Sequence, residues 1–449
     1  MKSALFSVRL RMLTPGGVTA PEALYAPQDT VPLRRDHNND VHLPGSTVAG
    51  SLREHCARYT ELAPTERLPE LFGPAPEANE RRAASPVGVL GTLLRSEKET
   101  SSAKRTSIDR ERGAAANTKL HHTELLAAGT EFDVVLRWDR PDERLDTLLR
   151  ALREWRPSIG RGTTHGAGKC QVVGLGHRVY DLADSKDLLD WIGLTSPEDY
   201  PTAQPCTADA ADDRLIDVEL RIVDGLHIGT GETETDSETG RERSPALKRD
   251  GEFLVPGTSL KGVLRSRVEY ICRVVGAPTC TGRNREDRED HEERGNCGHC
   301  RPCRIFGFSG KEAHTRRARI AVHDSIVTEP VKELRQHVAI DRFTGGAREK
   351  LLYTDEVVTA GRFRLRIDEL EPLDEPEPAG ASDSAADTTP RIGTNRLLLE
   401  TALTDIHDGL VGIGGRTTAG CGTVRVSDPD WQRPAEMTEL AERLREEHV

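Results

Sequence analysis

The sequence predicts an α+β protein that consists of two tandem copies of one domain. Three segments of the first half recur in the second half in the same order, and both halves alternate strand-like and helix-like stretches around them. Repetition at the scale of a whole domain indicates an internal duplication. The paired segments are 43–53 with 255–265, 107–113 with 339–345, and 159–168 with 413–422.

The first half contains four strand-like and two helix-like stretches. Alternating apolar and polar side chains mark the strands, and leucines at helical spacing, such as Leu145, Leu148 and Leu149, mark the second helix. This order predicts an α+β ferredoxin-like unit. The expected elements are a strand at 4–13, a helix from Pro44 to about Thr60, strands at 87–94 and 131–138, a helix at 142–153 and a strand at 170–173.

The second half repeats this order with insertions. We expect strands at 215–223, 320–324, 356–358, 362–367 and 423–426, and helices at 258–275 and 395–406. The predicted division is a first domain at 1–176, a linker at 177–213, a second domain at 214–430 and a C-terminal helix at 431–449. Within the second domain we expect a cysteine-bearing insertion at about 276–304 and a disordered loop at about 371–390, where Pro, Glu, Asp, Ala and Ser dominate.

The bulk composition excludes some classes of protein. The 449 residues carry a net charge of −12, so only local clusters of the 62 Lys and Arg residues are available for binding nucleic acid. No apolar stretch is long enough for a membrane span, and the N-terminus is typical of a strand rather than a signal peptide. Nine cysteines, four of them within 280–303, fit a reducing cytoplasm with one metal site better than a disulfide framework.

Four cysteines form the sharpest chemical pattern. Cys297, Cys300 and Cys303 follow one another at two-residue spacings, and Cys280 completes a tetrahedral set for structural Zn²⁺. A metal would order the charged segment 281–296, which has no apolar residues for a core. The alternatives are reduced surface thiols, or a ligand set in which one position is taken by His299, His291 or Cys272, although Cys272 lies on an apolar helix face.

Two of the repeated segments are candidates for binding phosphate. A helix that starts after Pro-Gly exposes backbone N–H groups that suit an anion, and glycine-rich loops let backbone approach a ligand closely. A plain strand–turn–helix is the alternative for the first pattern. The candidate residues are Ser46, Arg53, Thr258, Lys261 and Arg265 at the helices and Gly160, Arg161, Gly162, Gly414, Gly415 and Arg416 in the loops.

One loop carboxylate is a candidate catalytic group. Asp29 lies between the first strand and the first helix, and Asp36 is a weaker candidate in the same loop. Such a carboxylate can act as a general base or bind Mg²⁺ beside an RNA 2′-hydroxyl, although most loop aspartates have no such role. Counting back from Asp250 and Asp36 aligns Asp29 with Arg243, so the copies are expected to differ here.

Taken together, residues 256–265, 338–347 and 414–422 resemble the hallmark segments of the RAMP superfamily, specifically the backbone subunits of type III CRISPR effectors. The tandem copy resembles the fused subunits of the III-D branch, and the cysteine insertion is similar to zinc insertions of some members. The resemblance implies a ferredoxin-like (RRM-like) core in each half, bound guide RNA, and other RAMP subunits as partners.

The resemblance also implies roles for particular residues. Arms that insert at kinked nucleotides of the guide RNA would carry Ile108, Asp109, Arg110, Ile340, Asp341 and Arg342. A loop aspartate in the place of Asp29 would cut the paired single-stranded target RNA with a divalent metal. We therefore expect the first copy to cut and the second only to scaffold.

Two other functions remain open. One is a purely structural RNA-binding scaffold, for which replacement of Asp29 has no effect. The other is a guide-processing endoribonuclease, which needs a His or Tyr acid–base pair near the glycine-rich loops. Only His165 and the pair His121 and His122 are candidates, and the second copy matches neither.

Overall fold

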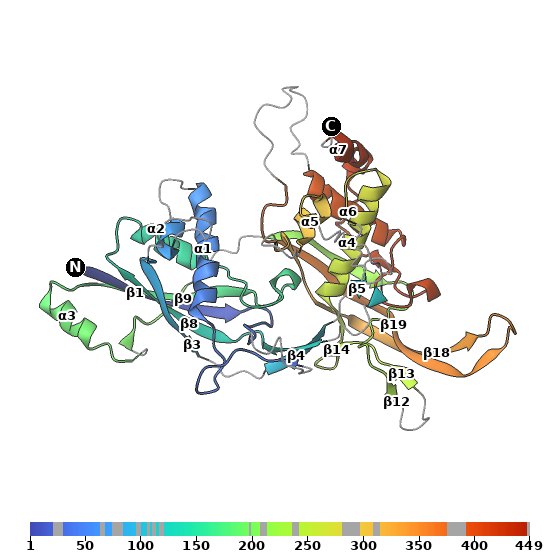
Figure 1. Ribbon diagram of the computed structural model, residues 1–449, viewed down its shortest axis with the longest axis horizontal. Helices are drawn as coiled ribbons and strands as arrows, with labels where there is room; N and C mark the ends of the chain where they lie inside the picture. The colour runs from blue at the N-terminus through green and yellow to red at the C-terminus, as the bar shows by residue number, and fades with distance from the viewer. Residues whose placement is uncertain are drawn as a thin grey trace, which may run out of the picture. The chain divides into compact units, whose positions relative to one another are not determined.

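The computed structural model describes residues 1–20, 30–62, 68–73, 84–95, 100–105, 108–109, 114–115, 121–196, 199–206, 213–235, 242–280, 297–308, 315–374 and 392–446. The chain divides into two compact units (Figure 1). Unit 1 comprises Met1–Ala103 and His121–Asp212, and unit 2 comprises Lys104–Leu120 and Asp213–Val449.

Unit 1 is built on an antiparallel sheet with the strand order β9-β1-β8-β3, extended at one edge by the short strand β10 (Figure 1). Numbered along the βαββαβ order, these strands are 4-1-3-2, which is the ferredoxin-like arrangement that the sequence predicts. The elements are β1 (Lys2–Met12), α1 (Gly45–Leu62), β3 (Val87–Leu94), β8 (Glu131–Asp139), α2 (Leu145–Glu154), β9 (Cys170–Asp181) and β10 (Gln204–Pro205).

The core of unit 1 lies between this sheet and its two helices. Helix α2 buries Leu148 and Leu152 completely, and the large rings of Trp138 and Trp155 are also buried. Burial of one such leucine contributes about 1.5–3 kcal/mol, so the leucine stripe read from the sequence is what fixes α2 on the sheet.

The predicted linker at 177–213 carries more structure than the sequence indicated. Strand β9 continues to Asp181, and helix α3 (Ser185–Ile192) follows, capped by Asp184, whose side chain accepts hydrogen bonds from the amides of Lys186 and Asp187. Trp191 of α3 packs edge-on against Tyr180, with ring centroids 5.3 Å apart. The Asp and Ser residues that suggested a linker are thus in part helix-capping residues.

Unit 2 repeats the ferredoxin-like sheet, with the strand order β20-β11-β19-β16 and antiparallel neighbours. Its own core is continuous from β11 to α7. Its sheet and main helices are β11 (Arg214–Ile222), α4 (Gly257–Val274), α5 (Arg301–Phe306), β16 (Ile320–Val322), β19 (Ala347–Glu369), α6 (Thr394–His407), β20 (Val424–Val426) and the C-terminal α7 (Leu440–Glu446).

A long hairpin projects from unit 2 (Figure 1). Strand β18 (Thr328–Ile340) pairs with the first part of β19, whose second part belongs to the sheet. Strand β18 was not predicted from the sequence, and β19 was predicted as two strands, because the hairpin residues are mostly exposed and show no apolar alternation. Its counterpart in the first copy includes β4 (Thr100–Arg105), β5 (Ile108–Asp109), β6 (Ala114–Ala115) and β7 (His121–Leu126).

Short elements complete the two units. In the first copy these are β2 (Thr30–Val31), η2 (Leu68–Phe72) and η3 (Thr163–His165). In the second copy they are β12 (Glu234–Thr235), β13 (Glu242–Ser244), β14 (Lys248–Arg249), β15 (Glu252–Val255), β17 (Ser325–Ile326), η5 (Thr417–Ala419) and η6 (Ala435–Glu439).

The first residues of the predicted disordered loop at 371–390 are ordered. Leu373 is buried, and Asp374 accepts hydrogen bonds from the amides of Asn395 and Arg396 at the start of α6. Their acidic, proline-flanked sequence suggested disorder, whereas the carboxylate serves as a helix cap from outside the helix. Residues 375–391 lie outside the described part of the chain.

Candidate metal centre and nucleic-acid interface

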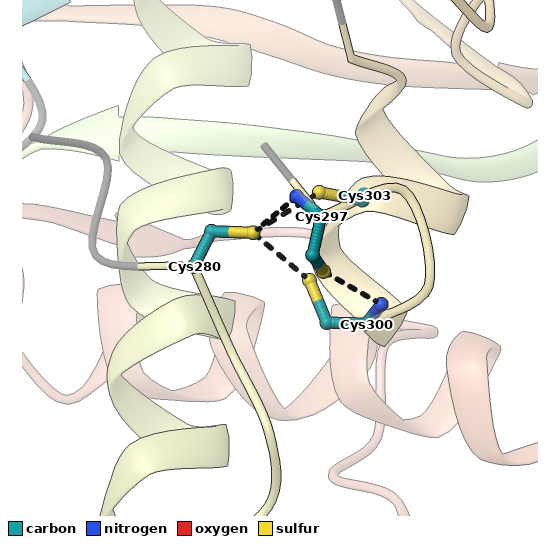
Figure 2. Close-up of side chains that lie close together, drawn as sticks. All are labelled: Cys280, Cys297, Cys300 and Cys303. Carbon is teal, nitrogen blue, oxygen red and sulfur yellow. Dashed lines mark hydrogen bonds between the residues drawn. The ribbon is translucent and has the colours of Figure 1, made fainter. Parts of the chain in front are cut away.

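The four predicted metal ligands meet beside the C-terminal end of α4. Cys280 follows that helix, Cys297 and Cys300 lie in the turn that leads into α5, and Cys303 lies within α5 (Figure 2). Their sulfur atoms all lie within 4.8 Å of one another. The structure therefore brings together side chains from both ends of the segment 281–296.

The distances fit a tetrahedral metal site. The Cys280 Sγ atom lies 3.7 Å from Cys300 Sγ and 3.6 Å from Cys303 Sγ (Figure 2). Four sulfurs held at about 2.3 Å from Zn²⁺ are separated by about 3.8 Å, so these spacings leave room for that ion. The Cys297 amide donates to Cys280 Sγ at 3.0 Å, and the Cys300 amide donates to Cys297 Sγ at 3.2 Å, as expected around thiolates.

The electrostatics differ between the thiols: burial raises the pKa of Cys280 to about 11, and a hydrogen bond to Cys300 raises the pKa of Cys303, so only Cys300 is favoured as a thiolate. A hydrogen bond from the Cys303 thiol, together with further neighbouring donors, lowers the pKa of the Cys300 thiol to about 4. Arg265 of α4 donates to the carbonyl of Gly307 at 2.9 Å and lies 3.9 Å from Cys303 Sγ. Four closely spaced cysteines with such support can bind a metal ion such as Zn²⁺.

Among the described residues, the alternative ligands Cys272 and His299 are not part of this cluster. Cys272 is fully buried in the core of unit 2, where burial raises the pKa of its thiol to about 11. His299 lies between two of the cysteines but is exposed, and His291 lies outside the described residues.

At the repeated helix start in unit 2, the backbone binds a carboxylate of the same chain. The Gly257 amide at the start of α4 donates to the Asp324 carboxylate at 2.8 Å, and Arg249 pairs with the same carboxylate. Arg265 pairs with Glu269 at 3.0 Å, so its charge is also used within the unit. An internal carboxylate thus occupies the place that the sequence analysis assigned to a phosphate.

Lys261 has a different environment from these arginines. It is largely buried, and burial together with the repulsion of Arg265 lowers the pKa of its ammonium group to about 8. Thr258 beside it is half-buried, as is Arg53 of α1, whereas Ser46 at the start of α1 is exposed. A nearby anion would favour the charged form of Lys261, so it stays a candidate phosphate contact.

The glycine-rich loops do make the close backbone approach that the sequence predicted, but to the chain itself. A side chain at Gly160 would meet the Gly17 carbonyl oxygen at 1.8 Å, and one at Gly414 would meet the His227 carbonyl oxygen at 2.5 Å. The Gly415 amide donates to that same His227 oxygen at 2.7 Å. These glycines therefore let each loop pack against the segment that follows the first strand of its unit.

The arginines of the two loops are not equivalent. Arg416 adopts the left-handed conformation, with φ of 59°, at the position where the first loop has Gly162, with φ of 82°. This conformation costs a non-glycine residue about 1–2 kcal/mol. Arg161 takes the position of Gly415 and is exposed. The backbone of unit 2 is therefore strained at Arg416, where the first copy has an unstrained glycine.

Arg416 belongs to a polar cluster that the sequence analysis missed. Its guanidinium binds the buried carboxylate of Asp355 through two hydrogen bonds of 2.9 and 3.3 Å, and it lies 4.8 Å from the ring centre of Tyr353. The His337 ring stacks on Tyr353 at 5.2 Å, and its Nε2 lies 3.4 Å from Asp355. The sequence contains no signal for this cluster, because it joins the exposed hairpin to a distant loop.

A second histidine lies beside the same loop. His227 is buried, and its Nδ1 atom lies 2.8 Å from the Glu356 carbonyl. The sequence named only His165, His121 and His122 as candidate acid–base groups, whereas His227, His337 and Tyr353 also lie near the second glycine-rich loop. In the first copy His165 lies in the loop on η3, and His121 and His122 lie on β7.

The repeated arm segments end up at hairpin tips. Ile340 pairs with Ala347 in unit 2, and Ile108 pairs with Ala115 in the same register. Asp341 shapes its tip by accepting hydrogen bonds from the amides of Phe343 and Thr344. Arg342 is exposed and Phe343 is fully exposed, while Arg110 lies outside the described residues.

Strand pairing corrects the register of the candidate catalytic loop. In the first copy Thr30 pairs with His122 and Val31 with Thr123. In the second copy Arg243 pairs with Thr354 and Ser244 with Asp355, in the same parallel manner.

Hydrogen bonds of two glutamates confirm this register. Glu124 accepts a hydrogen bond from the Leu33 amide and pairs with Arg35, while Glu356 accepts from the Ala246 amide and pairs with Lys248. Arg243 is therefore the counterpart of Thr30, and Glu242 is the counterpart of Asp29. The alignment of Asp29 with Arg243 was wrong by one residue, because it was counted through loops of unequal length.

The two candidate catalytic aspartates differ in what the structure describes of them. Asp29 lies outside the described residues. Asp36 is exposed, and its carboxylate accepts hydrogen bonds from the amides of Asn38 and Asp40, which keep the pKa of Asp36 below its ordinary value. Its role in this structure is to shape a turn.

Comparison with known proteins identifies the family. The model of the RAMP superfamily matches residues 12–171 and residues 219–425, one match for each copy. No curated protein matches the chain. None of the helices in the described residues combines the length and apolar character needed to cross a membrane. With both ferredoxin-like units matched over most of their length, the chain belongs to the RAMP superfamily as a tandem member, which indicates a CRISPR-associated, RNA-binding subunit.

Proposed function

We propose that this chain is a guide-RNA-binding backbone subunit of a type III CRISPR effector, of the fused III-D kind, and works in the cytoplasm with other RAMP subunits. The observation that carries the proposal is the match of both copies to one RNA-associated family. The matching register of the two hairpin tips supports it, since Ile108 and Ile340 lie at equivalent positions of two projecting arms.

The metal centre has a structural role in this proposal. Zn²⁺ held by Cys280, Cys297, Cys300 and Cys303 would tie the segment after α4 to α5, and the four cysteines leave no open coordination position for chemistry. RNA contacts would come from Lys261, Arg416 and the arms.

Cleavage of the paired target RNA is the finer part of the proposal. The Asp29 carboxylate would bind Mg²⁺ or take the proton of the attacking 2′-hydroxyl, so that the 2′ oxygen attacks the adjacent phosphorus and the 5′ oxygen leaves. The first copy would cut, and the second would act as a scaffold. Glu242 gives the second copy a carboxylate at the corresponding position, so its variant is included in the test.

The guide-binding proposal is tested by purifying the native complex and sequencing its RNA. We expect a uniform set of short RNAs that share a constant, repeat-derived end. Absence of RNA from a complex that still contains zinc would contradict the proposal and favour a protein-interaction scaffold.

The cleavage proposal is tested with the variants Asp29→Ala, Glu242→Ala and Asp36→Ala in the guide-loaded complex. Asp29→Ala should abolish one cleavage event on a complementary target RNA, at least about 100-fold, the size of a general-base contribution, without weakening guide binding. Asp36→Ala is the matched loop control. Unchanged product lengths for Asp29→Ala would support the non-catalytic scaffold instead, and loss of a product with Glu242→Ala would mean that the second copy also cuts.

A further inference from the structure

The cluster around Tyr353 is a built site rather than a chance gathering of polar groups. Asp355 at its base is completely buried, yet it binds Arg416 through two hydrogen bonds and contacts His337. A buried carboxylate with two cationic or polar partners fixes the orientation of both partners. The planar groups above it are therefore held in place before any ligand arrives.

The three planar groups lie against one another. The His337 ring stacks on the Tyr353 ring with an angle of 21° between their planes, and the Arg416 guanidinium also lies over Tyr353. The side chains of His337 and Arg416 remain 26% and 42% exposed. A partly exposed stack of rings and guanidinium is the arrangement on which nucleic-acid bases stack.

Two arginines lie beside the stack, and each is paired with an acidic group. Arg335 projects from the same face of β18 as His337, two residues earlier, and contacts Asp224 and the sulfur of Cys421 at the glycine-rich loop. Arg416 is paired with Asp355, and Arg335 is paired with Asp224 and Glu333, so these guanidinium groups are held in place beside the stack rather than adding net positive charge.

Unit 1 does not have this site. Strand pairing places Thr123 where unit 2 has Asp355, and the first glycine-rich loop has Gly162 where unit 2 has Arg416. The strained backbone of Arg416 is thus tied to a carboxylate that only the second copy possesses. Strain of this kind clusters at functional sites.

We propose that Tyr353, His337 and Arg416, anchored by Asp355, form a stacking site in unit 2 that holds one base of single-stranded RNA. The inference rests on the RNA-binding function proposed above and adds a difference between the copies, since the first copy has Thr123 and Gly162 at the positions of Asp355 and Arg416. Stacking reads no base edge, so the site accepts any of the four bases.

The test compares variants of the full chain in their affinity for a fluorescein-labelled single-stranded oligouridine. Tyr353→Ala should weaken binding about 5- to 100-fold, which is what one base–aromatic stack is worth, while Tyr353→Phe keeps the ring and should bind within about twofold of the unmodified chain. Tyr270→Ala is the matched control, because Tyr270 is a half-exposed tyrosine of unit 2 with its own arginine, Arg267, over the ring. It should bind as the unmodified chain does.

A second measurement decides the case if Tyr353→Ala does not fold. Ultraviolet crosslinking of the native RNA-bound complex should join a nucleotide to the peptide that contains Tyr353 or His337. RNA that is bound with equal affinity by Tyr353→Ala and Tyr270→Ala, or that crosslinks to neither peptide, would overturn the stacking site and leave the guide-binding function standing. An unmodified chain whose native complex holds no RNA would instead refute the guide-binding function.

Discussion

At the scale of single residues, the two copies share one hydrogen-bonded glutamate and differ in a neighbouring residue. Glu124 and Glu356 each accept a hydrogen bond from a backbone amide and pair with the basic side chain two residues after that amide. These contacts hold the segment before the first helix of each copy against the arm. Asp355, the neighbour of Glu356, has only Thr123 as its counterpart. The shared residue therefore serves the fold, and the residue found in one copy serves a site.

The protonation of Glu356 makes the stability of unit 2 depend on pH. Burial by itself would raise the pKa of Glu356, but the hydrogen bonds from Lys248 and the Ala246 amide bring it below its ordinary value. A lowered folded-state pKa contributes stability above the unfolded-state pKa and loses it as pH falls through the folded-state value. We expect Glu356→Gln to lower the free energy of unfolding at pH 7 by about 1–3 kcal/mol.

This effect is measured by urea unfolding between pH 7 and pH 3. Since the amide introduced by Glu356→Gln does not titrate, the stability of the variant should fall less steeply below about pH 4.5 than that of the unmodified chain. Glu252→Gln changes an exposed glutamate of β15 and serves as the control. Parallel pH profiles for Glu356→Gln and the unmodified chain would contradict the role of this carboxylate.

At the scale of elements, the cysteine cluster and the hairpin differ in their contribution to the stability of unit 2. The cysteines join α4 to α5 and are linked to the core through Arg265, whereas the hairpin of β18 and β19 leaves apolar side chains in solvent. Val331, Leu334, Val338, Ile340 and Phe343 are all at least 47% exposed. An element that exposes so many apolar groups contributes little to stability and suits a partner.

Removal of the metal should therefore act on unit 2 alone. We expect one Zn²⁺ per chain by mass spectrometry or elemental analysis, and loss of this ion in Cys300→Ser. The variant should lose on the order of several kcal/mol in the stability of unit 2, because metal binding is coupled to folding. The unfolding of unit 1 should stay unchanged. Cys206→Ser alters a thiol of unit 1 outside the cluster and should keep the metal; retention of zinc by Cys300→Ser would contradict the assignment.

A change at the hairpin tip should affect RNA binding but not the stability of unit 2. Phe343 is fully exposed, so Phe343→Ala should change the free energy of unfolding by less than about 0.5 kcal/mol. If the tip contacts RNA, the same change should weaken RNA binding by about 1–3 kcal/mol, the range for loss of one aromatic stacking partner. Leu410→Ala removes another exposed apolar side chain of unit 2 and should affect neither quantity. Equal RNA affinity for both variants would argue against a tip contact.

At the scale of the whole molecule, the net charge of the chain does not give the charge of an RNA-binding surface. The chain carries a net charge of −12, so we expect RNA binding to depend on particular basic groups, for which Lys261, Arg335 and Arg416 are candidates. Binding to phosphates releases counterions, and the logarithm of affinity should fall linearly with the logarithm of salt concentration, by about 0.7 for each phosphate contacted on a single strand. Titration of the complex between low and high salt measures this slope, and an affinity insensitive to salt would contradict a phosphate-binding surface.

The sequence by itself determined the duplication, the fold of each unit and the four cysteines that could hold a metal ion. Each of these depends on local or repeated patterns: leucines at helical spacing in α2, alternation in β1 and β11, and cysteines at two-residue spacings. Such patterns constrain structure because neighbouring residues decide which face of an element is apolar. The hairpin tips were also located by repetition, since Ile108 and Ile340 occur in matching segments.

Only the tertiary structure decided the rest. The register that aligns Glu242 with Asp29 depends on pairing between strands about one hundred residues apart, and unequal loops conceal it from a linear count. The Tyr353 site joins β18, β19 and the loop at Arg416, and its buried acid looks like any other charged residue in the sequence. Burial and pairing are properties of the packed chain, so the chemistry that depends on them becomes visible only in three dimensions.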